Sequence, residues 1–485
     1  MNRAVTLLAL LATGCTTMQP KYVQPDPSIP ASWPVGDPYL VAAEAGLPAL
    51  TYKQVFTDPR LQTLIAQAIA NNRDLRTAAA NVAAAREQYR IQRASQLPTV
   101  DASGGATFSG DKDNGVSARY DAGISVPSFE IDLFGRLRSL TDVQLNRYFA
   151  TEAGARATRL TLVANIANAW LDYAADSSLL RISTETAASA EKSVRLTRIR
   201  LEGGIAPRTD LDQAEQILAT AQADLARERT LVAQDVNALQ LLVGAPIAPP
   251  LLSGSIDDAF GTIAPVSPGL DSYVLLRRPD VVQAEYQLRA ADANIGAARA
   301  ALFPKITLTG LFGFASSALL KLLSAGAFGW SAGANANYTI FQAGAGHANV
   351  RLTEAQQRAA VSSYQSAIQT AFRDVADALA RRGTINDEIG ARTRQQAATA
   401  DAYLLTEARY REGIDPFLTV LDAQRSYYAS QQTLVNTKLT AAQNIVTTYQ
   451  AIGGDALLEG TPVCQRLPGD TGQPNAVLGL ECLPA

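Results

Sequence analysis

The chain repeats its own plan at a fixed spacing, and this repeat limits its possible folds more than any other feature. In the first part of each copy the matched residues lie 206 positions apart, in the pairs Asp74–Asp280, Arg93–Arg299 and Pro98–Pro304. Further along the spacing is 209, in the pairs Gly135–Gly344, Gly204–Gly413 and Pro207–Pro416. Two spacings that each stay constant over a long stretch of the chain indicate an internal duplication. We therefore expect a first repeat over residues 59–244, a linker over 245–278, a second repeat over 279–454 and an irregular tail over 455–485.

Each copy carries two segments in which apolar and polar residues alternate. The four segments are residues 99–108, 117–126, 306–313 and 330–337. This length and one apolar face are typical of transmembrane β-strands, and the small polar residues of the other face suit a water-filled lumen. Four strands are too few to close a barrel, and lipid forbids an open sheet edge. We therefore predict that the chain contributes four strands to a barrel shared by a cyclic oligomer; a soluble sheet packed on the helices is the alternative.

Long helical patterns occupy the rest of each copy. Asp58 and Pro59 open a helix that we expect to run to about Gln96. A longer pattern covers residues 135–202, breaks at two glycines and resumes over 207–243, which predicts an antiparallel coiled-coil hairpin. Hydrophobic residues make up 47% of the chain but aromatic residues only 7%, which suits helices packed closely side by side. The predicted fold class is an α+β membrane protein, internally duplicated, with long antiparallel coiled-coil helices and four membrane strands.

The N-terminus has the features of an export signal. Arg3 is followed by an apolar stretch over residues 5–12 that is too short to span a bilayer, and then by Gly14 and Cys15. This resembles a bacterial lipoprotein signal peptide over residues 1–14, in which the cysteine that follows, here Cys15, is acylated after cleavage. An ordinary secretory signal, with Cys15 discarded or left as a free thiol, is the alternative. The proline-rich residues 15–58 are expected to form an extended tether.

Cys464 and Cys482 are the two cysteines that remain in the tail. An even pair in an oxidising compartment predicts a disulfide. The bond would close a loop of about 18 residues and stabilise it by roughly 3 kcal/mol in the chain-entropy description.

Several classes of function are disfavoured by composition. The net charge is -3, so nothing points to nucleic acid. His347 is the single histidine and no Cys/His cluster accompanies it, which argues against a zinc site or histidine-based catalysis. No Walker or G-x-G-x-x-G motif occurs. We expect neither an enzyme nor a metal or other cofactor, apart from the covalent lipid on Cys15.

The stretch 408–424 predicts a second hairpin tip with an unusual face. Gly413 can take the positive φ that a chain reversal needs, and Pro416 suits the first turn of the helix that follows. Four residues of that helix share one apolar face: Phe417, Val420, Leu421 and Gln424. Leu418 and Asp422, together with Arg425, lie about 110° away from that stripe. A broad apolar stripe beside a solvated charge is the simpler interpretation of this pair.

Four stretches carry a resemblance to a known family: CTTMQPKYVQPDP (15–27), FEIDLFGRLRSL (129–140), LLRRPDVVQAEYQLRAADANIGAARAALFPKITLTG (275–310) and ARYREGIDPFLTVLDAQRS (408–426). They are similar to the outer-membrane efflux channels of the TolC/OprM type, in the lipoprotein branch of RND-type tripartite efflux systems. The resemblance implies a homotrimer with a shared 12-strand β-barrel in outer-membrane lipid and an α-helical tunnel extending into the periplasm. It also implies a periplasmic adaptor (membrane fusion) protein and an inner-membrane RND-type transporter as partners.

The same resemblance implies roles for residues at the second tip. Leu418 and Asp422 match the periplasmic constriction of these channels, and Tyr410 and Asp415 lie near enough to support the gate. The expected function is a passive, gated duct that exports small molecules to the cell exterior. A periplasmic coiled-coil adaptor or scaffold is the alternative. One departure is Gln342-Ala343-Gly344-Ala345, which stands where the family often has Asp-Gly-Gly-Arg.

Overall fold

A computed structural model describes residues 17–36, 38–39, 51–111, 115–266, 272–457, 465–466 and 480–481. Cys15, Cys464 and Cys482 lie outside these residues. The chain divides into two compact units, described separately below. Unit 1 comprises residues 1–26, 79–153 and 282–366, and unit 2 comprises residues 27–78, 154–281 and 367–485.

The helices confirm the duplication. The pairs that match between the copies are α4 (Arg73–Ala94) with α8 (Pro279–Ala300), α5 (Arg136–Glu202) with α9 (Ala345–Arg411), and α6 (Arg208–Val243) with α10 (Phe417–Ala451). The first pair has 22 residues in each member and the second pair has 67. Among the described helices, none combines the length and the apolar character needed to cross a membrane.

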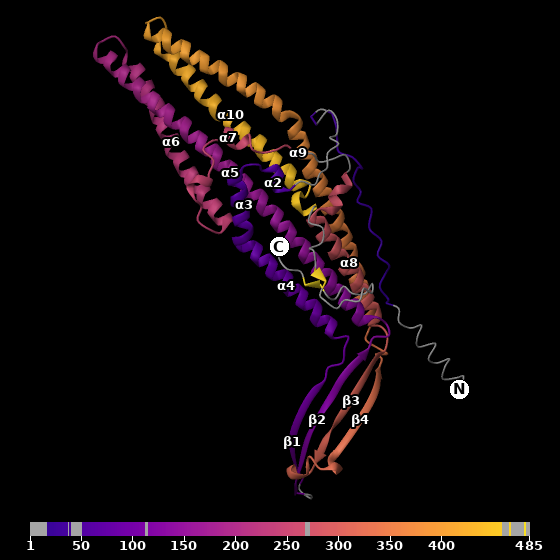
Figure 1. The fold of residues 1–485 in the computed structure, drawn as a ribbon. Coiled ribbons are helices and arrows are strands. Elements are labelled where there is room, and N and C mark those ends of the chain that lie inside the picture. The colour runs from indigo at the N-terminus through magenta and orange to yellow at the C-terminus, as the bar shows by residue number, and fades with distance from the viewer. Residues whose placement is uncertain are drawn as a thin grey trace. The chain divides into compact units, whose positions relative to one another are not determined.

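Unit 1 contains a four-stranded antiparallel sheet (Figure 1). Its strands follow one another in space as they do in sequence: β1 (Asp101–Asp111), β2 (Gly115–Ile131), β3 (Lys305–Ser316) and β4 (Phe328–Asn337). The pairing of β2 with β3 joins the two copies, with Ile131 opposite Ile306. Strands β1 and β4 are therefore the edges of the sheet, and the four predicted strands are confirmed. Two short 3₁₀ turns, η3 (Leu319–Lys321) and η4 (Ala325–Ala327), lie between β3 and β4.

The junction of β2 with α5, also in unit 1, is held by stacking and charge. Phe134 stacks on Phe303 with ring centroids 4.6 Å apart. Glu130 accepts hydrogen bonds from the guanidinium of Arg136 at 2.7 and 2.8 Å and pairs with Lys305 at 3.2 Å. These contacts fix the end of the sheet against the first turn of the helix.

The N-terminal segment of unit 1 is extended and lies against the helices. Tyr22 donates a hydrogen bond to Glu285 at 3.2 Å, and the guanidinium of Arg289 stands 4.7 Å from the Tyr22 ring centroid. A Cβ on Gly296 would approach within 2.9 Å of the backbone nitrogen of Gln19, so this glycine permits the close contact. Packing, rather than secondary structure, positions the segment.

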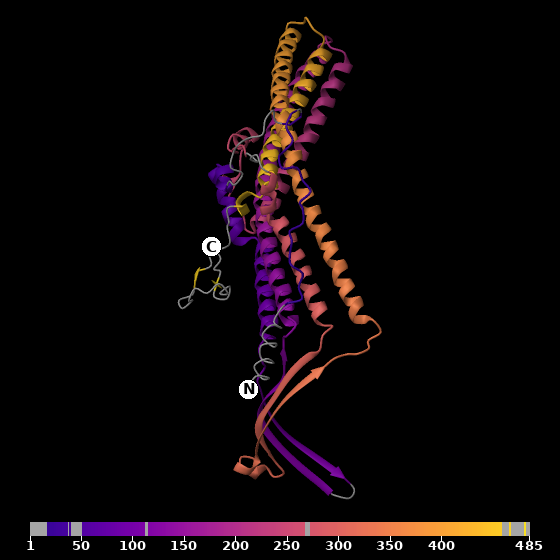
Figure 2. The same cartoon turned by 90° about the vertical axis from the view of Figure 1, so that its right-hand side faces the viewer.

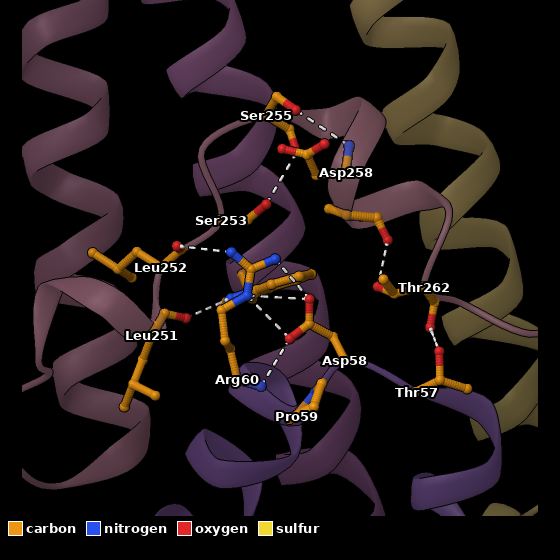
Figure 3. A network of polar contacts seen from close by, with 12 residues as sticks. Thr57, Asp58, Pro59, Arg60, Leu251, Leu252, Ser253, Ser255, Asp258 and Thr262 are labelled. Carbon is orange, nitrogen blue, oxygen red and sulfur yellow. Dashed lines mark hydrogen bonds and ion pairs between the residues drawn. The ribbon is translucent and has the colours of Figure 1, made fainter.

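Unit 2 is built on the helical hairpins and on short elements that pack against them. The short elements are α2 (Tyr52–Val55), α3 (Pro59–Asn71), η1 (Pro249–Leu251), α7 (Ile256–Phe260), η2 (Ser272–Arg277) and η5 (Gly454–Leu457). Asp58 caps α3 by accepting from the amide of Arg60 at 2.8 Å, as the Asp-Pro start predicts. The Arg60 guanidinium donates a hydrogen bond to the same carboxylate at 2.7 Å, as Figure 3 shows. Beside it, Ser255 caps α7 by accepting from the amide of Asp258 at 3.2 Å.

One predicted helix is wrong in its length. The segment expected to run unbroken from residue 59 to about 96 divides at Asn72, which has φ -57° and ψ 134°. The Asn72 carboxamide accepts from the amide of Leu75 at 3.0 Å and donates to the carbonyl of Leu242 at 2.8 Å. Asparagine side chains compete in this way with helical hydrogen bonds. A tertiary contact with α6 therefore ends α3 and starts α4.

Beyond η5, the described residues of the tail form one short antiparallel pair, β5 (Gln465–Arg466) and β6 (Leu480–Glu481).

Candidate functional site

The tip of the second hairpin, between α9 and α10, closes in a Schellman turn. Gly413 has φ 75°, its amide donates to the carbonyl of Tyr410 at 3.0 Å, and the amide of Ile414 donates to the carbonyl of Arg409 at 2.9 Å. This pattern satisfies the last carbonyls of a helix and needs a residue with positive φ. Gly204 takes the same place in the first copy, with φ 74°. The predicted reversal at Gly413 is confirmed.

The predicted apolar face of α10 is buried within unit 2. Pro416 is the N-cap of α10, one residue before the first turn in which we expected it. Phe417 and Leu421 are 3% and 2% exposed. They pack in a cluster that joins both hairpins, whose other members are Val194, Ala214, Tyr410 and Val420. Figures 1 and 2 both show the two tips side by side. The stripe inferred from spacing is therefore the surface that holds the tips together.

Leu418 and Asp422 lie off that stripe, as predicted. Leu418 is 48% exposed, and the side chain of Asp422 is 60% exposed. Their separation of four residues puts them on one helix face, about 6 Å apart along the axis. Asp422 forms an ion pair with Arg425 on the next turn. An apolar side chain, a carboxylate and its counter-charge thus follow one another on an exposed face.

Tyr410 links the two tips. Its ring lies 5.1 Å from that of Phe417, and the guanidinium of Arg200 from the first copy stands 4.4 Å from its centroid. The phenol is 8% exposed, and its hydroxyl has no hydrogen-bond partner within the part of the chain that the structure describes. A cation over an aromatic face attracts it electrostatically, so Tyr410 acts here through its ring rather than its hydroxyl.

Asp415 is bound within its own tip. Arg409 donates to the two carboxylate oxygens at 2.6 and 2.9 Å. These hydrogen bonds lower the pKa of Asp415 below its usual value, so the carboxylate remains ionised at neutral pH. The ion pair of Arg409 with Asp415 stabilises the turn between α9 and α10.

Two arginines of this site, Arg200 and Arg409, were missing from the predicted residues. Arg200 and Arg409 are equivalent in the two copies, since they lie 209 residues apart. The backbone carbonyl of each accepts a hydrogen bond from the amide five residues further on, which closes the turn. Arg409 binds Asp415, whereas the first copy has Ala206 at the matching position, and Arg200 instead lies over Tyr410. The helical spacing placed Arg425 on the face of Leu418 and Asp422, and the structure adds its ion pair with Asp422, as opposite charges three residues apart on a helix are neighbours.

The chemistry of the site is electrostatic and steric. Among the described residues, no group of three or more His, Cys, Asp or Glu side chains is arranged to hold a metal ion. The tip presents an apolar side chain, a carboxylate and cations. Such groups can control the passage of solutes and need no reactive centre.

Comparison with known protein families finds the same duplication. Residues 64–245 and 271–454 match the family described as outer membrane efflux protein. The two matched segments correspond to the two copies of the duplicated chain.

Curated relatives extend the likeness to nearly the whole sequence. The antibiotic efflux pump outer membrane protein ArpC of Pseudomonas putida is 40% identical over 463 residues, which cover 94% of this chain and 95% of the relative. The probable outer membrane lipoprotein SilC of Salmonella typhimurium is 35% identical over 455 residues, covering 93% and 98%.

Solved structures share the fold. The open state of the Neisseria gonorrhoeae MtrE outer membrane channel superposes with a TM-score of 0.83 at 34% identity. The match covers 91% of this chain and 99% of that one.

Proposed function

The chain belongs to the outer membrane efflux protein family, and we propose from that premise that its second hairpin tip is the gate of an export duct. The protein is the outer-membrane component of an efflux pump and is not an enzyme. The proposal concerns which residues open and close the passage. The exposed pair Leu418 and Asp422 supports it most, because these side chains stand on the face of α10 that the hairpins leave uncovered.

We propose that three protomers assemble around one axis. Each protomer has a sheet with two edge strands, β1 and β4, and open edges are not tolerated in lipid. Pairing β4 of one protomer with β1 of the next would give a closed barrel of 12 strands. The helical hairpins would then form a tunnel on the periplasmic side.

In such a trimer the gate consists of two rings. Leu418 makes an apolar ring, and Asp422 makes an anionic ring about 6 Å away. An apolar constriction resists wetting, and a carboxylate ring favours cations. Arg425 offsets part of that charge, while Tyr410 and Asp415 hold the tip in place through Arg200 and Arg409.

The partners and the lipid belong to the same proposal. A periplasmic adaptor and an inner-membrane RND-type transporter would deliver cargo to the hairpin tips. The relative named as an antibiotic efflux protein supports small organic molecules as cargo. The relative named as a lipoprotein supports acylation of Cys15.

Single-channel conductance in planar bilayers tests the gate. We expect Leu418→Ala and Asp422→Ala each to raise conductance, and Asp422→Ala also to lower cation preference. Arg425→Ala should increase cation preference, because it leaves the Asp422 charge unopposed.

Matched controls are Leu405→Ala, an exposed leucine of α9, and Asp212→Ala, an exposed aspartate of α6. Both controls should conduct as the unmodified protein does. Unchanged conductance and selectivity in all three gate variants would show that this face is only a solvated surface.

A further inference from the structure

The sheet of unit 1 has one apolar face and one face of small and polar residues. Residues opposite each other in antiparallel strands share a face, so the pairing assigns each side chain to a face. Ile124 of β2 lies opposite Phe312 of β3, which lies opposite Trp330 of β4. These three side chains are 55%, 60% and 67% exposed. Their face suits lipid, so the other face lines the lumen of the proposed barrel.

The lumen face of the sheet has a row of very small side chains. Across the four strands this row consists of Ser103, Gly123, Gly313 and Gly329. A Cβ on Gly123 would approach within 2.7 Å of the carbonyl oxygen of Phe312, so glycine permits the close approach of β2 and β3 here. The row leaves free space for the side chains of the rows beside it.

Two charged residues of β2 occupy the next two rows of the same face. Asp121 lies between Gly105 of β1 and Ala315 of β3, and Arg119 lies opposite Thr107 of β1. The Asp121 carboxylate lies over Gly105, since a Cβ there would meet its oxygens at 3.1 and 3.2 Å. Asp121 is half-buried, whereas Arg119 is exposed and forms no ion pair within the part of the chain that the structure describes. The guanidinium is therefore the more accessible of the two charges to a solute in the lumen.

We infer that the Arg119 side chains of the three protomers form a cationic ring inside the barrel, which binds anionic groups of solutes that pass through. The inference rests on the proposed trimeric duct and adds a contact within it. A guanidinium presents its N–H donors in a fixed plane and can bind a phosphate or carboxylate group through two of them at once. The ring differs in sign from the proposed carboxylate ring of Asp422, so the two rings favour different charges.

The width of the barrel decides how far this charge acts. Strands about 4.8 Å apart and tilted by about 40° close, in a trimer of four-stranded sheets, into a cylinder of about 12 Å radius. Salt screens charges over about 30 Å at about 0.01 M and over about 3 Å at about 1 M. One unopposed charge per protomer therefore raises the concentration of a monovalent counter-ion on the axis roughly threefold in dilute salt, and has no measurable effect at about 1 M.

Ion selectivity in dilute potassium chloride tests the ring. Each variant is made in the Leu418→Ala protein, called the parent here, so that the proposed gate does not limit the current. Reversal potentials are measured across a planar bilayer under a salt gradient. Arg119→Gln leaves Asp121 unopposed and should raise the permeability ratio of potassium to chloride roughly threefold. Asp121→Asn should lower this ratio by a similar factor, and both changes should disappear at about 1 M salt.

Two further variants separate the charge of Arg119 from a structural role. Arg119→Lys keeps the charge and should keep the selectivity of the parent. Ser117 lies on the same face of β2, one row further along. Arg119→Gln combined with Ser117→Arg should therefore restore the selectivity of the parent, whereas a residue that only supports the strand would not be replaced in this way. Migration as an oligomer in unheated detergent gels shows that each variant is assembled.

Block of the current by a polyanion tests the contact with solutes. Tripolyphosphate is added to each side of the bilayer in turn. It should reduce the current through the parent, and Arg119→Gln should raise the concentration needed for half block roughly tenfold. Arg119→Lys should lie between the two, because an ammonium group does not bind phosphate through two parallel donors. Equal block of the parent and Arg119→Gln would contradict the proposed contact.

The outcomes distinguish the ring from the gate. If Arg119→Gln and Asp121→Asn both have the selectivity and the block of the parent, the ring is overturned, and the conductance of Leu418→Ala still decides the gate. If Leu418→Ala conducts as the unmodified protein does, the gate is overturned, and the variants of Arg119 still decide the ring. If neither the unmodified protein nor any variant forms a pore, the duct and the ring are both overturned.

Discussion

Adjacent residues of α10 have opposite environments. Phe417 is buried between the two hairpins, whereas Leu418, the next residue, is half exposed. The helix turns about 100° per residue, so neighbouring side chains face different surroundings. A structural role and a gating role can therefore lie side by side without sharing a residue.

Phe417→Ala should loosen the tip, and Leu418→Ala should not. The buried ring packs on Tyr410, and its loss should cost about 3 kcal/mol. If opening is local, amides in the first turns of α10 should exchange with solvent roughly a hundredfold faster. Hydrogen exchange followed by mass spectrometry measures this, with Leu418→Ala as the control. Equal protection in the two variants would contradict the assigned packing.

Cys15 should carry a lipid. The apolar stretch before it is too short to span a bilayer and ends at Gly14 and Cys15. Labelling with radioactive palmitate should mark the unmodified protein and should be lost in Cys15→Ala. Because the sheet itself is expected to anchor the protein, the variant should still sediment with membranes. Equal labelling of both proteins would exclude acylation at this position.

At the scale of elements, α5 and α6 enclose a group of carboxylates in unit 2. Burial and the neighbouring charges of Asp176 and Asp172 raise the pKa of Asp235 to about 7. Burial and the charge of Glu228 also raise the pKa of Asp176, while Arg227 opposes that shift. The first hairpin therefore encloses a carboxyl group, that of Asp235, whose protonation changes close to neutral pH.

This group should make the stability of unit 2 depend on pH. The folded protein binds the proton of Asp235 more tightly than the unfolded chain, so its contribution is present in acid and is lost as pH rises toward about 7. Asp235→Asn keeps a hydrogen-bond donor for Asp176 and removes the charge. We expect a higher melting temperature than the unmodified protein at about pH 8, and a smaller difference at about pH 5.

Circular dichroism of the detergent-solubilised protein measures this, and the exposed Asp212→Asn serves as the control. If Asp235→Asn has the same dependence of melting temperature on pH as the unmodified protein, the raised pKa of Asp235 does not contribute to stability.

At the scale of the whole molecule, we expect the assembled oligomer to resist unfolding better than a single protomer does. A closed ring of strands has no free edge, and its opening breaks many hydrogen bonds at once. Unboiled samples should therefore migrate as an oligomer in detergent gels and shift to the monomer on heating. An adaptor built of coiled coils, the alternative that sequence alone left open, should show no such shift. A monomer band before heating would argue against the closed ring.

Much of the architecture follows from local patterns in the sequence. Period-two alternation identified the four strands, because side chains of a strand alternate between faces. Gly204 and Gly413 marked the hairpin turns, because few other residues tolerate the required φ. The spacing of Phe417 and Leu421 identified the buried face of α10, and the duplication followed from two constant shifts.

Other features depended on contacts between segments distant in sequence. Asn72 ends α3 because its side chain meets a carbonyl of α6, and no local pattern reveals that carbonyl. Arg200, which lacks a counterpart of Asp415, lies over the ring of Tyr410 from the other hairpin, and no local pattern reveals that ring. The raised pKa of Asp235 likewise requires the packing of α6 on α5. Local sequence determined where the four strands and the long helices lie along the chain. Tertiary structure decided the boundary between α3 and α4 and which polar groups meet, because hydrogen bonds and charges act only across the short distances that folding creates.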